Sequence, residues 1–393
     1  MYVLAGEKMS SLKQASNLIQ ILKNELSKRF VEKDVEINAL LVGLLSREPV
    51  IIVGLPGTAK TKLIETLAKM INCKYFVYLL TRYTEPDEIF GPIDINALRE
   101  GKYIRIMKNT ILDADVVFLD EIFKASSAIR NTLLRILNEK KYTFTSMDIP
   151  VNWLGFYSAS NEISTDSEDQ ALYDRLVIRI FTHYVSATNI KELLMKGIEL
   201  EDNYVSPVIM KEEVQELQRI VSERFKMLKN DSVLDRYIEA LMELRMKGIE
   251  LSDRRKIKVL KVATSISVLY GATDVTLDDV AEALRLVAPH SEDDIPKIEE
   301  VIARVGLSAL GKLSKEIETL ITELNNITKK IEEAQSLEEF RQLRQMGTAI
   351  IKQLQEKLTQ LANRNDPRVD RYLKRIKDTI ADFKHAIEKK LGE

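Results

Sequence analysis

The sequence predicts an α/β domain, in which a parallel sheet carries helices on both faces, followed by a small all-helical domain and a helical C-terminal arm. Short apolar runs alternate with helix-period segments through the first half of the chain, a pattern typical of parallel sheets. Only helical periodicity follows, and a heptad stripe begins beyond Pro296. With 393 residues there is room for two or three domains. We expect three, at 1–185, 186–295 and 296–393.

Composition limits the classes of partner and compartment. The 58 Lys and Arg residues nearly balance 60 Asp and Glu, so the overall charge does not favour a nucleic-acid partner. Cys73 is the one cysteine and cannot form an internal disulfide, and the three histidines lack metal-ligand spacing. Residues 1–8 lack a signal-peptide core, and the longest apolar stretch, near 37–45, is too short to cross a membrane. We therefore expect a cytoplasmic protein without a membrane span.

The first elements are two helices in residues 8–46, followed by a buried strand at 50–53. The sequence GLPGTAKT then leads into an amphipathic helix at 62–71, which is the context of a phosphate-binding P-loop. Backbone N–H groups of such a loop and the helix N-terminus attract phosphates. The expected nucleotide-binding residues are Gly54, Pro56, Gly57, Thr58, Ala59, Lys60 and Thr61.

Each polar residue of this loop has an expected task. Lys60 would reach the β- and γ-phosphates, and the Thr61 hydroxyl would ligate Mg²⁺. Ala59 departs from the strict motif, which has glycine there. We expect alanine to adopt a helix-start conformation at this position. The alternative is an ordinary strand-to-helix turn that contains glycine and lysine by chance.

A second acidic motif favours the nucleotide site. The four apolar residues 116–119 are followed directly by Asp120 and Glu121. This pattern is typical of a buried strand whose end places carboxylates beside a P-loop. Asp120 would hold the Mg²⁺ water shell against Thr61, and Glu121 would polarise the attacking water. Alone, two acids after a strand more often cap a helix, but the P-loop about sixty residues earlier favours catalysis.

Further strands and insertions surround these motifs. Residues 74–79 form a predicted strand, and the segments 95–98 and 103–106 suggest an inserted hairpin, with a solvated loop as the alternative. Residues 125–138 are helical by their periodicity, and 140–151 suggest a second hairpin. A predicted buried strand at 153–160 is followed directly by Asn161, which could contact a γ-phosphate or be a turn residue. Arg175 lies between a short helix and a fifth strand, where it could also form a surface ion pair.

These residues carry a family resemblance. GLPGTAKT, TRYTEPDEIFGP, VVFLDEIFKASSAIRNTLLRILNEKKY, SASN, ALYDRL and LSDRR, in this order and spacing, resemble the MoxR group of AAA+ ATPases, and within it the regulatory ATPase variant A subgroup. The likeness covers roughly residues 8–289. It implies an ATP- and Mg²⁺-dependent P-loop ATPase with a helical lid, assembled as a hexameric ring with nucleotide between subunits. It also implies chaperone-like remodelling of partner proteins, including von Willebrand factor A domain proteins.

The resemblance also assigns roles to single residues. Asn161 resembles sensor 1, Arg175 the arginine finger that acts on a neighbour's nucleotide, and Arg254 sensor 2. Arg179 is a weaker finger candidate. With Glu121, the first three make up the expected catalytic set.

The helical second half has its own signals. Thr276 and Asp279 fit a capping box within the lid. The basic run of Arg254, Arg255, Lys256, Lys258 and Lys261 is interpreted as a solvated helix face rather than a nucleic-acid patch. Beyond residue 296 the heptads predict three helices of about 25 residues that fold back as an antiparallel bundle. The β-rich insertion found in relatives of the subgroup is not seen here.

Two other classes of function remain open. A nucleic-acid motor or loader is the first, because related ring ATPases carry similar inserts, although no helix-turn-helix pattern follows the lid. A nucleotide-gated scaffold is the second, and it would need the same motifs.

Overall fold

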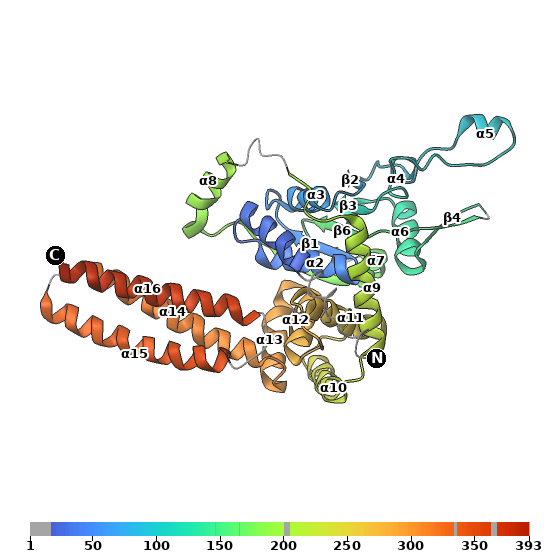
Figure 1. Ribbon diagram of the computed structural model, residues 1–393. Coiled ribbons are helices and arrows are strands. Elements are labelled where there is room, and N and C mark those ends of the chain that lie inside the picture. Colours follow the sequence, from blue (N-terminus) through green and yellow to red (C-terminus); the bar gives the residue numbers. More distant parts are fainter. Residues whose placement is uncertain are drawn as a thin grey trace, which may run out of the picture. The chain divides into compact units, whose positions relative to one another are not determined.

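The computed structural model describes residues 17–145, 147–164, 166–199, 205–333, 336–362 and 368–392 (Figure 1). The chain divides into two compact units, Met1–Val301 and Ile302–Glu393. The first unit therefore holds the α/β part together with the helices that follow it. The three-domain division stays a prediction.

The first unit is built on a five-stranded sheet in which every pairing is parallel. Its order is β2-β3-β6-β1-β7, so β1 is an inner strand flanked by two strands from later in the chain. This confirms the predicted parallel sheet. The strands are β1 (Val50–Gly54), β2 (Tyr75–Leu79), β3 (Val116–Asp120), β6 (Gly155–Ser160) and β7 (Ile178–Thr182).

Helices cover both faces of the sheet, as predicted. Residues 17–29 are helical, and α2 (Asp34–Ser46) packs against β1, β6 and β7, where the Tyr157 hydroxyl donates to the Leu40 carbonyl at 3.1 Å. Side chains of the opposite face, such as Ile51, share a core with Ile129 and Leu133 of α6 (Ser127–Glu139). The helix α3 (Lys60–Met70) packs against β2 and β3, and α7 (Ser167–Arg175) against α6.

Two insertions extend from the α/β part (Figure 1). The segment after α4 (Pro86–Phe90) contains the short helix α5 (Ile95–Arg99), so the predicted strand at 95–98 is wrong. The two sides of the insertion still meet in an antiparallel bridge between Ile93 and Arg105. Asp94 starts this helix, because its side chain accepts hydrogen bonds from the backbone N–H of Asn96 and Ala97 at 2.9 and 3.1 Å. The second insertion is the antiparallel hairpin of β4 (Lys141–Phe144) and β5 (Met147–Pro150), which confirms the other predicted hairpin.

Helices make up the rest of the first unit. The capping box at Thr276 and Asp279 is present at the start of α12, as predicted. The elements are α8 (Ile190–Glu199), α9 (Lys211–Met227), α10 (Asp231–Met246), α11 (Asp253–Leu269), α12 (Leu277–Val287) and α13 (Ile295–Val305), with 3₁₀ turns at Ile122–Lys124, Ala187–Asn189 and Glu292–Asp294. The boundary between the two units falls inside α13.

Beyond the end of α13, the described residues of the second unit form three helices that pack against one another, α14 (Ala309–Glu333), α15 (Leu337–Ala362) and α16 (Arg368–Gly392). They contain 25, 26 and 25 residues, which agrees with the predicted lengths. Their shared core includes Ile317, Leu324, Leu354, Ile376 and Phe383. The side chains of Leu310, Leu361 and Glu339, which belong to the predicted heptads and capping box, lie outside the described residues.

Candidate nucleotide site

The predicted P-loop follows β1 at the carboxyl edge of the sheet, where α/β folds commonly bind ligands. Gly54 is required here by close packing. A Cβ at this position would lie 2.3 Å from the backbone oxygen of Thr182 on the neighbouring strand β7. Glycine therefore lets the loop leave β1 beside β7 without displacing either strand.

Ala59 precedes α3 and has a left-handed backbone, with φ 64° and ψ 20°. The expectation of a helix-start conformation is therefore wrong. The left-handed region brings a Cβ close to the following carbonyl and costs a non-glycine residue about 1–2 kcal/mol. The loop thus holds alanine in a conformation that glycine would adopt without this cost.

Lys60 directs its side chain to the inner side of the loop. The Nζ donates to the carbonyls of Gly54 and Leu55 at 2.5 and 3.1 Å, and to Asn161 Oδ1 at 3.3 Å. Burial lowers the pKa of Lys60, while the negative charges of Asp120 and Glu121 act in the opposite direction. These two carboxylates favour the charged ammonium that phosphate binding needs.

Thr61 and Asp120 bring a hydroxyl and a carboxylate together. Thr61 Oγ1 lies 3.4 Å from Asp120 Oδ2, which is long for a hydrogen bond between oxygens. Neighbouring ligands of an octahedral Mg²⁺ ion are separated by about 2.9 Å when each Mg–O distance is about 2.05 Å. Both oxygens are hard donors of the kind that Mg²⁺ prefers, so the pair fits a magnesium site after a small movement.

Glu121 lies at the end of β3 and is held by two side chains. Asn161 Nδ2 donates a hydrogen bond to Glu121 Oε1, and Lys124 Nζ lies 3.4 Å from Glu121 Oε2. Asn161 thereby connects Glu121 with Lys60, whose ammonium donates to the other end of the same amide. The structure brings together the phosphate-loop lysine, both carboxylates and Asn161, as the sequence predicted.

Arg175 and Arg254 form a separate group. Arg254 Nη1 lies 3.9 Å from Asp174 Oδ2, and Arg175 Nε donates to Asn138 Oδ1 at 2.9 Å. Burial lowers the pKa of Arg175, and the charge of Arg254 lowers it further. The contacts of Arg254 thus join it to the end of α7, and none of them reaches the P-loop.

Strand register places this arginine group at the opposite edge of the sheet. Ile178, the first residue of β7, pairs with Val50 at the amino end of β1, whereas the P-loop follows Gly54 at the carboxyl end. The five residues of β1 span four steps of about 3.3 Å, so the two edges are about 13 Å apart along this strand. Arg175 precedes β7, so it lies on the side away from its own P-loop.

Arg179 is a buried structural residue, and the weaker finger assignment is wrong. Its side chain is 2% exposed, and its guanidinium donates to the carbonyls of Pro289 and Tyr173 at 2.9 and 2.7 Å. The guanidinium carbon also lies 3.7 Å from the centre of the Tyr173 ring. A side chain fixed in this way cannot extend to a second molecule.

Comparison with known proteins identifies the family. A family model described as the MoxR domain in the MoxR-vWA-beta-propeller ternary systems matches residues 16–219, which contain the P-loop, both carboxylates, Asn161 and Arg175. The chain belongs to the MoxR family of AAA+ ATPases. Its sheet order and the residues gathered at the carboxyl edge are therefore those of a MoxR domain.

Individual relatives of this MoxR protein extend over more of the chain. It is 31% identical to an uncharacterised protein of Methanocaldococcus jannaschii, over 79% of this chain and 82% of the relative. It is 22% identical to Chaperone MoxR1 of Mycobacterium tuberculosis, over 68% of this chain and 73% of that protein. A solved structure from Cytophaga hutchinsonii, described as a candidate ATPase, shares the fold with a TM-score of 0.63 and 20% identity, covering 77% of this chain and 98% of that one.

One residue of the MoxR domain that touches the site, Tyr184, was missed by sequence analysis. Its hydroxyl donates to the Pro56 carbonyl at 3.0 Å, and buried Lys33 supports it by donating to the carbonyl of His183, the residue before it. The only available sequence signal was an aromatic residue soon after a buried strand. Such residues occur in many folds, so the signal indicated no site.

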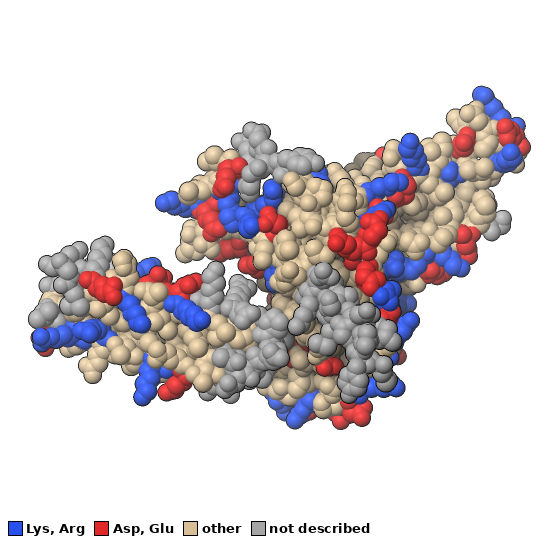
Figure 2. All heavy atoms as spheres, viewed as in Figure 1, with Lys and Arg blue, Asp and Glu red and all other residues tan. Residues whose placement is uncertain are grey.

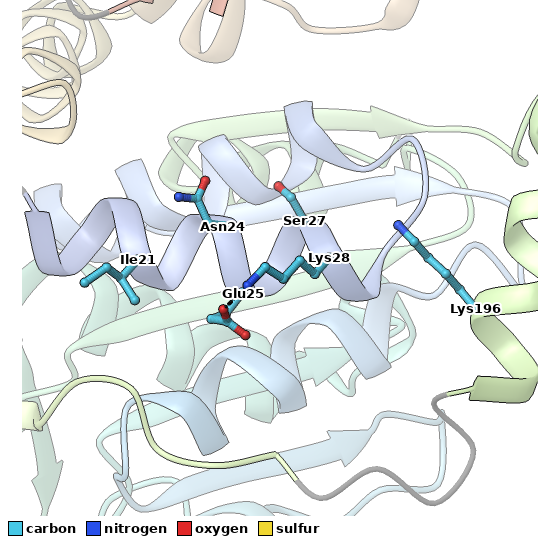
Figure 3. A pocket seen from close by; sticks show the side chains of 6 residues that line it. All are labelled: Ile21, Asn24, Glu25, Ser27, Lys28 and Lys196. Carbon is cyan, nitrogen blue, oxygen red and sulfur yellow. Dashed lines mark hydrogen bonds and ion pairs between the residues drawn. The ribbon is translucent and has the colours of Figure 1, made fainter.

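A pocket of about 650 Å³ lies elsewhere in the MoxR protein (Figure 3). Five of its lining residues come from the helical segment 17–29, and Lys196 of α8 reaches toward them. Glu25 and Lys28 form an ion pair of 2.5 Å within it. None of the candidate site residues lines this pocket, and it supports no catalytic role.

Proposed function

We propose that this MoxR protein is an ATP-hydrolysing ring ATPase that uses Mg²⁺ and remodels partner proteins. The observation that carries the proposal is the gathering of Lys60, Thr61, Asp120, Glu121 and Asn161 at one edge of the sheet. ATP hydrolysis needs a cation at the phosphates, oxygen ligands for Mg²⁺ and a carboxylate beside the attacking water. These residue types supply all three.

Each residue then has a defined task. The ammonium of Lys60 and the backbone N–H groups of the P-loop bind the phosphates. Thr61 and Asp120 would hold Mg²⁺, which would supply positive charge at the phosphates. Glu121 accepts a proton from the attacking water, and the amide of Asn161 orients that carboxylate. The Asn161 amide can also sense the phosphate, because it already contacts Lys60.

The separation of the two edges supports a ring. Arg175 precedes the amino end of β7 and Arg254 contacts Asp174 beside it, whereas the P-loop lies at the opposite edge of the sheet, about 13 Å away along β1. This placement favours contact with nucleotide in another subunit. We propose that both act on a neighbour's nucleotide in a homo-oligomer, with a hexamer as the expected size.

The partner class comes from the family. Because the matching family model is described by ternary systems that include a vWA component, we propose a von Willebrand factor A domain protein as client. The assignment to the regulatory ATPase variant A subgroup and the cytoplasmic location remain parts of this proposal that rest on the sequence. Among the described residues, no helix is both long and apolar enough to cross a membrane.

The basic run of α11 does not favour the alternative of a nucleic-acid motor. Lys258 and Lys261 both pair with the buried carboxylate of Glu48, at 2.6 and 2.7 Å. Arg255 is 0% exposed and donates to the Val287 carbonyl. On the face shown in Figure 2, acidic and basic side chains are intermingled. The run therefore lacks the free cations that phosphate backbones require.

The test compares two single variants. Lys60→Ala should weaken ATP binding at least about tenfold, because it removes a charged donor to the phosphates. Glu121→Gln should keep binding and lower kcat by about 10²–10⁴, the usual contribution of a general base. Binding is measured by calorimetry and turnover by phosphate release.

The controls are Lys62→Ala, an exposed lysine on the same helix, and Glu139→Gln, an exposed acid on α6. Both should behave as wild type. Hydrolysis at the normal rate by Glu121→Gln would remove that carboxylate from the mechanism. In a pull-down with ATP, the Glu121→Gln protein should retain more client than the wild-type protein does. If the protein is instead a nucleotide-gated scaffold, the variant and the wild type should retain the client equally.

A further inference from the structure

Tyr184 reaches from the end of β7 to the P-loop. Its hydroxyl donates to the carbonyl oxygen of Pro56 at 3.0 Å, and its ring lies over Gly57, where an added Cβ would be 4.0 Å from Cε1. The Tyr184 side chain is 60% exposed. Core packing therefore does not explain its position, and the hydrogen bond to the loop is its main polar contact.

The backbone that carries Tyr184 is fixed from behind by buried charges. Lys33 Nζ donates to Thr182 Oγ1 at 2.8 Å and to the His183 carbonyl at 2.7 Å. Glu36 neutralises this lysine at 3.0 Å, and both side chains are buried. An ion pair in such a place holds its geometry closely, because moving either partner would leave a buried charge unpaired.

The chain after Tyr184 is fixed as well. Glu32 accepts hydrogen bonds from the backbone N–H of Ser186 at 2.6 Å and from Asn189 Nδ2 at 2.5 Å. Tyr184 thus lies on a short segment that is tied at both ends to the turn before α2. A side chain on such a segment can position the loop that it contacts.

The Pro56–Gly57 peptide is the part of the P-loop that Tyr184 contacts. Gly57 has φ 80°, the value of the third residue in a type II turn, for which proline is favoured at the second position. Type I and type II turns differ by a flip of the peptide between these two residues. In a trans peptide the carbonyl and the following N–H point in opposite directions. Fixing the Pro56 carbonyl toward Tyr184 therefore turns the Gly57 N–H to the other side.

We propose that Tyr184 is a positioning residue of the phosphate loop. Its hydroxyl holds the Pro56–Gly57 peptide in the type II orientation and so directs the Gly57 N–H toward the phosphate chain of the nucleotide. This inference rests on the proposed function. It assigns the recognition of phosphate, not of the base, to a residue outside the P-loop motif.

The test is the binding of ADP, pyrophosphate and adenosine to Tyr184→Phe, which keeps the ring and loses the hydroxyl. Loss of one hydrogen bond should weaken ADP and pyrophosphate binding about 5- to 10-fold and leave adenosine binding unchanged. The KM for ATP should rise by the same factor while kcat stays within about twofold. Tyr75→Phe, on the exposed edge strand β2, is the matched control.

A second variant tests the route through the peptide. Gly57→Ala strains the type II orientation directly, because alanine avoids φ 80°. In that background, Tyr184→Phe should add little further loss, since the two changes act on the same peptide. Fully additive losses would overturn the proposed route.

Other results would also contradict the inference. Wild-type affinity for ADP in Tyr184→Phe would show that the hydroxyl has no role. Equal losses for ADP and adenosine would assign the residue to the base instead. If the wild-type protein itself binds no ADP, the proposed function fails, and this outcome is distinct because it appears without any change at Tyr184. Far-ultraviolet circular dichroism melting confirms that each variant is folded.

Discussion

At the scale of single residues, Ala59 is the clearest departure from the P-loop motif. Its left-handed backbone is required because the chain must turn from the loop into α3, and the cost of the Cβ there is offset by the rest of the loop. The nucleotide site therefore contains a small local strain that a glycine would remove.

Ala59→Gly should leave the free energy of unfolding unchanged or raise it by up to about 1 kcal/mol. Relief of the left-handed conformation is partly cancelled by the greater freedom of glycine in the unfolded chain. Thermal and chemical unfolding measure this difference, and nucleotide affinity should be retained.

The control is Ala128→Gly, an exposed alanine with helical backbone in the first turn of α6. It should destabilise by about 0.5–1 kcal/mol, because no strain is relieved there. If Ala59→Gly is destabilising by the same amount as the control, the left-handed alanine carries no cost.

At the scale of elements, α13 is the helix in which the boundary between the two units falls. Arg285 of α12 donates to both oxygens of Glu299, and Lys247 pairs with Glu300 at 2.5 Å. Ile298 and Val301 are buried beside these charges. The first half of α13 is therefore bound to the helices before it, and a boundary at residue 296 would cut these contacts.

Truncation after Ser308 should leave a folded nucleotide-binding protein, whereas truncation after Pro296 should destabilise it by at least about 3 kcal/mol. The shorter protein loses two buried apolar side chains worth about 1.5–3 kcal/mol each, together with the ion pairs of α13. Chemical unfolding and ADP binding of the two proteins measure the difference.

The protein truncated after Ser308 lacks α14–α16, so its client binding tests the role of these helices. We expect client binding to be weakened, because these helices form a separate compact unit suited to docking.

Equal stability of the proteins truncated after Ser308 and after Pro296 would show that α13 is not part of the first unit.

At the scale of the whole molecule, the two sheet edges divide the proposed catalytic groups. The phosphate-binding loop and both carboxylates lie at the carboxyl edge, and Arg175 lies beyond the amino edge. One chain therefore provides the phosphate-binding half of one site and the arginine half of another. A second copy of the chain would complete each site.

Arg175→Ala should bind ATP nearly as wild type but hydrolyse it about 10³–10⁵ times more slowly, the range of arginine fingers. Mixing it with Lys60→Ala subunits should restore part of the activity, at interfaces where an intact P-loop meets an intact Arg175. Phosphate release from rings shown to be mixed is the measurement.

Arg135→Ala, which changes an exposed arginine on α6, should be fully active. Absence of recovery in mixed rings would argue against action between subunits. Full activity of Arg175→Ala alone would leave Arg254 as the candidate, since Arg179 is buried.

The sequence by itself determined the elements and most of the site. Apolar runs predicted the inner strands of the sheet, because a parallel strand covered on both faces must be apolar along its length, and aromatic and branched residues predicted the edge strand β2. The carboxyl edge could be predicted too, since motif residues that follow parallel strands must meet there. Lys60, Asp120, Glu121 and Asn161 meet as expected for this reason.

Only the tertiary structure decided the remaining features, because each depends on residues distant in the chain or on backbone angles. Arg254 contacts Asp174, which lies 80 residues away along the chain, and buried Arg179 donates to the Pro289 carbonyl, 110 residues away. Tyr184 contacts Pro56, 128 residues away. Asp94 opened a helix where the sequence had suggested one side of a hairpin, since a local cap outweighs weak propensity. Periodicity reports which face of an element is apolar, but not which distant polar group its side chains meet.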